Sequence, residues 1–315
     1  MPTILLVGLG IVGLAVLPVA ADQMVLGAGR LAAVLRISPV VVGVVVIGLG
    51  TSVPEFLVSG LAAGSGRGGL ALGNLIGSNI VNVTLILGVA GLMAPVVVRS
   101  SVPAREAPLT LLAVIVFGGF AWWGLRLPAG LVLAGLLVVA VVLLLRVARV
   151  GPRDPLPGEV AERIGAPTCS PAREVVRVLL GLAGTLGAAQ LVVVSADGVA
   201  HRWGVPDVVI GVTVVALGTS LPELVTAVQA QRRGESDLLV GNVLGSNLFN
   251  SLAGGAVVGL AAHGGGAFRV GYPVVAVMVG VNLLAWLVLF RGYRVSRPEA
   301  GLLLGAYLLT LPLLV

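Results

Sequence analysis

The stretch LGTSVPE at residues 49–55 is found again, with one change, as LGTSLPE at residues 217–223. A second stretch, GNLIGSNIVN at residues 73–82, is found again as GNVLGSNLFN at residues 241–250. The offset between copies is constant, since 217 − 49 and 241 − 73 both give 168. Composition bias would match some Gly, Val and Leu residues, but it would not align these polar motifs at one offset. The sequence therefore contains an internal repeat, and each copy is expected to build the same structure.

The composition is that of a membrane protein. Hydrophobic residues make up 58% of the chain, charged residues only 10%, and the mean hydropathy is +1.12. Soluble domains carry about 25% charged residues. Apolar stretches of about 20 residues, long enough to cross a bilayer, recur along the whole length. We expect an all-α polytopic membrane protein with ten transmembrane helices, at residues 3–20, 38–64, 70–95, 107–124, 127–147, 174–196, 205–230, 238–262, 270–290 and 300–315.

The centre of the chain divides these helices into two sets of five. Residues 149–172 are polar and Pro-rich, which predicts a cytoplasmic linker. The first five-helix repeat then covers residues 1–148 and the second covers residues 173–315. Because five is an odd number, the second repeat enters the membrane from the opposite side. The two repeats are therefore expected to be inverted about an axis in the membrane plane.

The arginines predict the orientation in the membrane. All 19 basic residues are Arg. If the N-terminus is outside, 15 of them lie on the inside and only four on the outside, namely Arg67, Arg126, Arg202 and Arg269. This positive-inside bias predicts that both termini lie outside. It also accounts for the net charge of +6 without a nucleic-acid partner.

A proline follows the Thr-Ser pair in each copy. Pro54 and Pro222 have no backbone N–H, so each deprives the carbonyl four residues earlier of its helical partner. A break at membrane depth is tolerated only where the freed groups meet protein or an aqueous cavity. We expect a broken helix in each repeat, with backbone oxygens near Thr51 and Thr219 as candidate cation ligands.

Glu55 and Glu223 lie directly after these breaks, in strongly apolar segments. A carboxylate buried there must be protonated, paired or bound to a cation. No arginine occurs in the core segments near them, which makes a fixed salt bridge unfavoured. Two neutral, hydrogen-bonded Glu residues are one alternative, but a repeated pair indicates a shared cation site.

The third and eighth expected helices supply polar partners at intervals of four residues, which places them on one helix face. Beside that face, four glycines are expected to allow close helix packing, namely Gly73, Gly77, Gly241 and Gly245. We expect cation ligands at Ser78, Asn82, Ser246 and Asn250, and interhelical hydrogen bonds from Asn74, Asn79, Asn242 and Asn247. An all-oxygen set suits hard cations such as Ca2+, Na+ or Mg2+.

Together, the two repeated motifs resemble the alpha repeats of the cation/Ca2+ exchanger superfamily, in particular those of prokaryotic Na+/Ca2+ exchanger homologues. The resemblance implies that Glu55 and Glu223 are the central Ca2+ ligands, with Asn82 and Asn250 at the middle of the cluster. Asn at position 250 resembles the K+-independent exchangers. The resemblance further implies backbone ligands at Thr51 and Thr219, and Na+ sites completed by Ser52, Ser78, Ser220 and Ser246.

These features favour a secondary active cation antiporter that works by alternating access, and the resemblance implies that it exports Ca2+ as Na+ flows in. A Glu pair binds protons as readily as metal ions, so H+/Ca2+ exchange at the same residues is an alternative. A channel-like uniport pathway is less favoured, because two buried Glu residues in an inverted repeat argue against it. An enzyme is not expected, since the sequence has no nucleophile–base pair and no metal-binding His set.

The expected partners follow from this function. They are Ca2+, Na+ or H+, and the lipid bilayer, with no nucleic acid and no cofactor. We expect an integral protein of a prokaryotic inner membrane that functions as a monomer.

Overall fold

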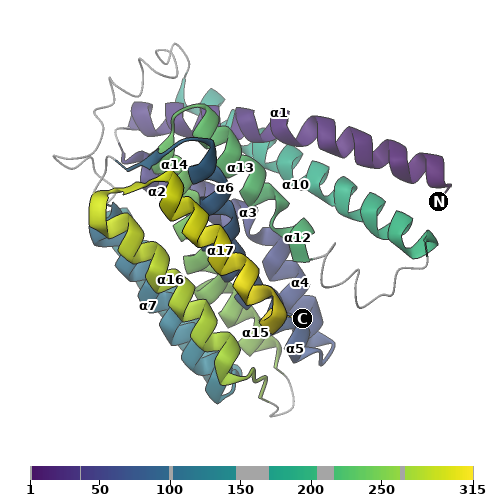
Figure 1. Ribbon diagram of the computed structural model, residues 1–315, viewed down its shortest axis with the longest axis vertical. Helices are drawn as coiled ribbons and strands as arrows, with labels where there is room; N and C mark the ends of the chain where they lie inside the picture. The colour runs from purple at the N-terminus through teal and green to yellow at the C-terminus, as the bar shows by residue number, and fades with distance from the viewer. Residues whose placement is uncertain are drawn as a thin grey trace.

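The computed structural model describes residues 2–35, 37–98, 102–146, 170–203, 216–262 and 267–314, which are almost entirely helical (Figure 1). The first half contains α1 (Thr3–Leu35), α2 (Pro39–Val42), η1 (Gly43–Gly48), α3 (Leu49–Thr51), α4 (Val53–Gly64), α5 (Gly68–Val81), η2 (Asn82–Ile86), α6 (Leu87–Met93), β1 (Val96–Val97), α7 (Val102–Trp123) and α8 (Leu127–Arg146). The second half contains α10 (Pro171–Arg202), α12 (Ala216–Thr219), α13 (Leu221–Arg232), α14 (Ser236–Phe249), η4 (Asn250–Gly254), α15 (Gly255–Ala261), α16 (Tyr272–Gly292), β2 (Arg294–Val295) and α17 (Arg297–Leu314).

The sequence repeat is also a repeat in structure. Helix α13 has the bounds of α4 shifted by 168 residues, and α14 and α15 relate to α5 and α6 in the same way. Even the short π-helical turns η2 and η4, which open on Asn82 and Asn250, obey this offset. The two-residue strands β1 and β2 pair antiparallel, and they connect the segment between α6 and α7 with the segment between α16 and α17.

Seven described helices are long and apolar enough to cross a membrane, and the bent pair Pro39–Thr51 and Val53–Gly64 raises the number to eight. The expected count was ten. The expected span 205–230 falls partly on residues 204–215, which lie outside the described residues. Helix α17 opens on Arg297 and Glu299, which lowers its hydropathy relative to the other spans. The ten-span arrangement therefore stays a prediction.

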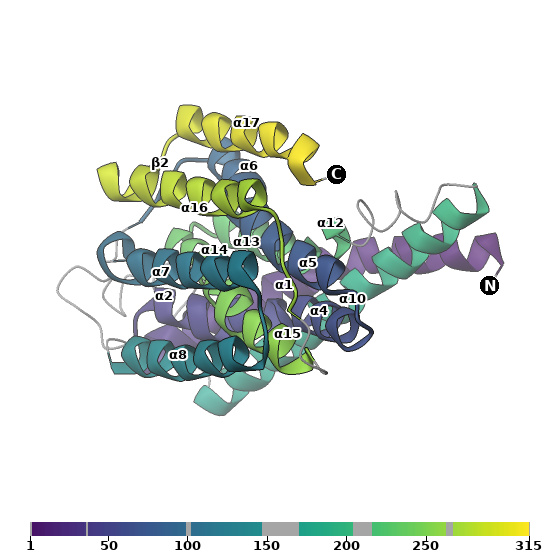
Figure 2. The ribbon, with the colours of Figure 1, turned by 90° about the horizontal axis from the view of Figure 1, so that it is seen from below.

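Helices α1 and α10 form an antiparallel pair whose one end projects from the side of the other helices (Figures 1 and 2). Arg202 at the end of α10 donates a hydrogen bond to Thr3 at the start of α1. Near the opposite end, Arg177 Nη1 donates to Gln23 Oε1 at 2.8 Å. Small residues bring the two backbones together at four pairs: Gly10 with Ser195, Gly13 with Val192, Met24 with Gly181, and Gly27 with Val178.

Helix α1 is longer than the span expected at residues 3–20, because it continues through Asp22 to Leu35. The Asp22 carboxylate receives two hydrogen bonds of 2.7 Å from the Arg233 guanidinium, which follows α13. A bidentate ion pair of this kind satisfies a carboxylate that water would otherwise have to solvate. The helix continues past Asp22, and the ion pair between Asp22 and Arg233 connects α1 to the end of α13.

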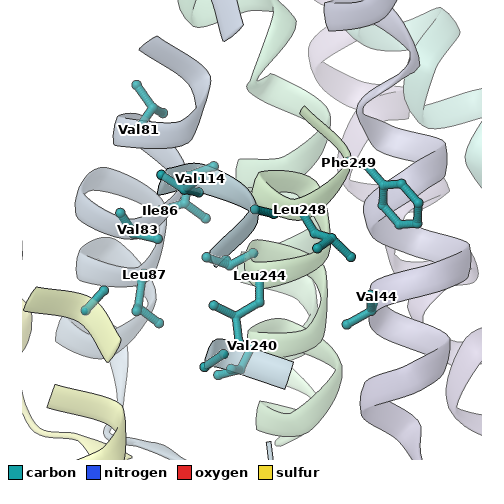
Figure 3. Packing of buried hydrophobic residues seen from close by; sticks show 14 of the residues in the cluster. Val44, Val81, Val83, Ile86, Leu87, Val114, Val240, Leu244, Leu248 and Phe249 are labelled. Carbon is teal, nitrogen blue, oxygen red and sulfur yellow. The ribbon is translucent and has the colours of Figure 1, made fainter. Parts of the chain in front are cut away.

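Helix α14 lies at the centre of the buried hydrophobic cluster (Figure 3). Its glycines approach the backbone of the first repeat, as predicted. A Cβ atom at Gly245 would lie 2.6 Å from Val44 Cα, and one at Gly241 would lie 2.6 Å from the Val40 carbonyl oxygen. For Gly73 and Gly77 the expectation of close packing stays a prediction, since their equivalent partner segment falls mostly outside the described residues.

We predict that Gly245→Ala destabilises the protein by about 1–3 kcal/mol, the usual effect of overpacking, because the new methyl group would meet main-chain atoms that cannot turn away. Gly135→Ala is the matched control, since a Cβ there meets no atom of the described chain within 4 Å. Thermal unfolding in detergent should show a lower Tm for Gly245→Ala only. Equal melting temperatures for the two variants would contradict the close contact.

Candidate cation site

Both expected helix breaks are present. Ser52, between α3 and α4, has φ −80° and ψ 2°, and Ser220, between α12 and α13, has φ −90° and ψ 3°. In the first repeat, the two helical parts are bent by 43°. The breaks place Glu55 and Glu223 in the first turns of α4 and α13. Because a helix N-terminus carries a partial positive charge, it favours a carboxylate at that position.

The two carboxylates are buried and have no counter-charge among the residues that the structure describes. Glu55 is 0% exposed and Glu223 is 1% exposed. Neither of them joins an ion pair in the part of the chain that the structure describes. Both oxygens of Glu55 and Oε2 of Glu223 also lack a hydrogen-bond donor there. Such groups are costly to bury unless another charge neutralises them.

Contacts between the repeats bring the two carboxylates to one centre. Ser52 Oγ, from the first repeat, donates to Glu223 Oε1 of the second at 3.4 Å. Ser52 lies at the helix break three residues before Glu55, so this contact lies between the chain segments that carry the two carboxylates. Ser78 is also buried, at 4% exposed. The two repeats therefore meet beside the Glu residues, and a shared cation site stays a prediction.

The remaining hydroxyl residues of the predicted set are buried around this centre. Thr51 Oγ1 donates to the Ile47 carbonyl at 3.0 Å and lies 3.4 Å from Asn242 Oδ1. Ser246 Oγ lies 3.4 Å from the carbonyl oxygen of Gly48, so it contacts the first repeat. Thr219 and Ser220 are 7% and 3% exposed.

Asn74 and Asn242 hold the helices in place, as expected. Asn74 Nδ2 donates to the Glu55 carbonyl oxygen, and Asn242 Nδ2 donates to the Glu223 carbonyl oxygen, both at 3.4 Å. Asn74 thus joins α5 to α4, and Asn242 joins α14 to α13 in the same way. The equality of the two bonds shows that the repeats build the same local structure.

Asn82 and Asn250 open the π-helical turns η2 and η4. Sequence reasoning missed these turns, and no local sequence signal distinguishes them from a continuous α-helix. Both residues are buried, and neither hydrogen-bonds to a Glu side chain. Asn82 Oδ1, and both Oδ1 and Nδ2 of Asn250, have no partner within the described residues. Single π-helical turns are often found at functional sites.

The candidate ligand atoms of the site are oxygens. Buried acceptors without a protein donor include oxygens of Glu55, Glu223, Asn82 and Asn250. Among the described residues, no group of three or more His, Cys, Asp or Glu side chains is placed to hold a metal ion. Carboxylate, amide and hydroxyl oxygens suit hard cations rather than zinc or copper.

Buried carboxylates between two repeated helix units are typical of ion-coupled membrane transporters. The chain matches the family described as sodium/calcium exchanger protein over residues 5–146 and 174–315. It is 36% identical over 306 residues to the putative antiporter CaxA of Alkalimonas amylolytica, with 95% of each chain covered. It is 37% identical over 243 residues to the inner membrane protein YrbG of Escherichia coli (strain K12), with 76% of this chain and 75% of YrbG covered.

The fold is similar to that of the sodium-calcium exchanger NCX_Mj soaked with Na+ and Ca2+. The TM-score is 0.85 with 30% sequence identity, over 98% of both chains. The chain therefore belongs to the sodium/calcium exchanger family, a family of transporters and not of enzymes. The resemblance inferred from the repeated motifs is confirmed.

We predict that Ca2+ raises the Tm of the wild-type protein in detergent and that Glu223→Gln loses this increase. A ligand at 100 times its Kd stabilises the folded state by about 2.7 kcal/mol. Without Ca2+, the Tm of Glu223→Gln should not fall, because the substitution removes a buried, unneutralised charge. Glu299→Gln is the control, since Glu299 lies outside the site and accepts a hydrogen bond from Ser296. A full Ca2+ response in Glu223→Gln would argue against the shared site.

Proposed function

We propose that this protein is a secondary active antiporter that exchanges Na+ for Ca2+ across the membrane by alternating access, and exports Ca2+ as Na+ flows in. The observation that carries the proposal is the pair of buried carboxylates, Glu55 and Glu223, with no protein counter-charge in the described chain. Membership of the sodium/calcium exchanger family supports cation exchange. The choice of Na+ as the driving ion is our proposal.

The ligands that we propose come from both repeats. Glu55 and Glu223 bind Ca2+, with Asn82 and Asn250 at the centre of the site, and no resident cofactor takes part. Their burial and their unpartnered oxygens support this role. The backbone carbonyls of two threonines assist, and four serines complete the Na+ sites: Thr51, Thr219, Ser52, Ser78, Ser220 and Ser246.

The charge of the site explains why the protein would exchange ions and would not let Ca2+ leak across the membrane. Without a bound cation, the two carboxylates would have to pass through an occluded state of low dielectric with a charge of about −2, and that is costly. A loaded site is close to neutral. The transporter therefore changes state only when Ca2+ or its competitor is bound, and each transport direction requires an ion.

We propose that the moving unit is the pair α1 and α10, which shifts across a site that stays near mid-membrane. Their antiparallel packing supports an arrangement of ten spans in two inverted five-helix repeats, residues 1–148 and 173–315. The protein lies in a prokaryotic inner membrane as a monomer, with both termini outside and residues 149–172 in the cytoplasm.

H+/Ca2+ exchange is the second candidate. Carboxylates without an ion-pair partner in the described chain are able to take up protons as well as metal ions. The same two Glu residues would then carry either Ca2+ or two protons, and the four serines would have no ion of their own to bind. Uniport through the same pathway is less favoured, because the charge argument opposes return of the empty site.

The deciding experiment is Ca2+ uptake into proteoliposomes loaded with Na+, compared with vesicles that carry only a proton gradient. We expect uptake with the Na+ gradient alone. Uptake with the proton gradient alone would replace Na+ by H+, and uptake with neither gradient would contradict antiport. Glu55→Gln and Glu223→Gln should each abolish exchange, while Glu299→Gln should retain it.

Cys169 is the only cysteine of the chain, and it lies in the proposed cytoplasmic linker, outside the described residues. A membrane-impermeant maleimide should therefore label it in permeabilised spheroplasts and not in intact ones. As a control, Pro2→Cys in a Cys169→Ser background should be labelled in intact spheroplasts. The opposite labelling pattern would reverse the proposed orientation.

A further inference from the structure

Asn282 is a buried amide in the middle of α16 that neither repeated motif contains. It is 5% exposed, and it is the single amide or ionisable side chain between Tyr272 and Arg291. Its counterpart at the repeat offset, 282 − 168, is Val114. Burying a polar group at such a position costs free energy unless it is hydrogen-bonded. The hydrogen-bond partners of Asn282 therefore indicate its role.

Main-chain carbonyl oxygens fix the orientation of the Asn282 amide. Asn282 Nδ2 donates to the Met278 carbonyl at 2.8 Å and lies 3.5 Å from the Asn79 carbonyl. A carbonyl oxygen only accepts hydrogen bonds, so the NH2 group must be on this side. Asn282 Oδ1 therefore points the other way, where it accepts a hydrogen bond from Asn247 Nδ2 at 2.7 Å.

Hydrogen bonds through Asn247 fix the orientation of the Asn82 amide as well. Asn247 Nδ2 also donates to the Asn79 carbonyl at 2.9 Å, so both of its N–H groups are used. Its Oδ1 is left to accept from Asn82 Nδ2, at 2.9 Å. Asn82 then has its NH2 group engaged, and its buried Oδ1 is the atom without a partner in the described chain. Three amides thus have one consistent orientation.

Among the described residues, no equivalent relay leads to Asn250. Asn79, the counterpart of Asn247, donates instead to Ser251 Oγ at 3.1 Å and to the Met278 sulfur at 3.6 Å. Asn250, the counterpart of Asn82, has no hydrogen bond from either amide atom within the described residues. Hydrogen bonds from the described chain therefore orient the amide of Asn82 but not that of Asn250.

We propose that Asn282 is a positioning residue for cation binding: through Asn247, it turns the Asn82 amide so that its oxygen, and not its NH2 group, is presented to the transported ion. The inference deepens the proposed function and rests on Asn82 as a ligand. An amide oxygen attracts a hard cation, whereas an NH2 group in the same place repels it. Asn282 therefore sets ion affinity without touching the ion.

The test compares the Ca2+ concentration for half-maximal transport in Asn282→Leu, Asn82→Ala and the double variant. The Asn79 carbonyl still holds Asn247 when Asn282 is replaced, so the effect is graded. We expect a rise of about 3- to 10-fold, the effect of one buried hydrogen bond, with the maximal rate retained. In the Asn82→Ala background, Asn282→Leu should add nothing, because no amide remains to be oriented.

Ser251→Ala is the matched control. It removes the Ser251 hydroxyl, a buried acceptor for the Asn79 side chain that takes no part in the relay. The half-maximal Ca2+ concentration of this variant should equal that of the wild type. Asn282→Ser replaces Asn282→Leu if the latter does not fold, because a serine hydroxyl can bond within its own helix but is too short to reach Asn247. An unchanged affinity in the Asn282 variant would overturn the proposal. An equal loss in the Asn82→Ala background would also overturn it, because it would point to packing.

The Ca2+-induced rise in Tm, measured on the same proteins in detergent, separates this inference from the antiport proposal. A reduced rise in Asn282→Leu with an unchanged rise in Ser251→Ala would support the relay even if the driving ion proves not to be Na+. A normal rise in Asn282→Leu would overturn the relay and leave the antiport proposal standing. No rise in the wild-type protein would overturn both.

Discussion

The structure depends on one constraint, which is that two carboxylates are buried among apolar helices and receive no opposite charge from the described protein. The helix breaks at Ser52 and Ser220 meet part of this constraint, since they place both Glu residues in the first turn of a helix. The contact of Gly241 and Gly245 with the first repeat meets another part, because it allows the two halves to approach closely. In the function that we propose, a bound cation neutralises the remaining charge.

Much of this could be predicted from the sequence, because polar residues at a fixed offset report local constraints that both copies share. The helix breaks, the burial of Glu55 and Glu223, and the hydrogen bonds of Asn74 and Asn242 are of this kind. Features that depend on distant partners could not be predicted. One such feature is the ion pair between Asp22 of α1 and Arg233, which lie 211 positions apart. The π-helical turns have no local sequence signal either.

The candidate site shows the same division between local and distant causes. The residues that we propose as ligands were visible in the motifs, but the orientation of the Asn82 amide was not, because Asn282 lies outside the repeated blocks and has Val114 as its counterpart. A lone Asn in an apolar helix gives a weak signal when it is read by itself. Its meaning comes from two carbonyl oxygens, those of Met278 and Asn79, which become neighbours only in the folded chain.

The contacts between α1 and α10 are related by the repeat offset of 168. Gly10 with Ser195 becomes Val178 with Gly27, and Gly13 with Val192 becomes Gly181 with Met24. A surface in which residue i meets j while the equivalent of j meets the equivalent of i is an isologous dimer interface. The α1–α10 pair therefore has the contact pattern of an interface between two equivalent half-length subunits. In such a homodimer every substitution would occur twice; in one continuous chain the two halves can diverge, and an asymmetric residue such as Asn282 becomes possible.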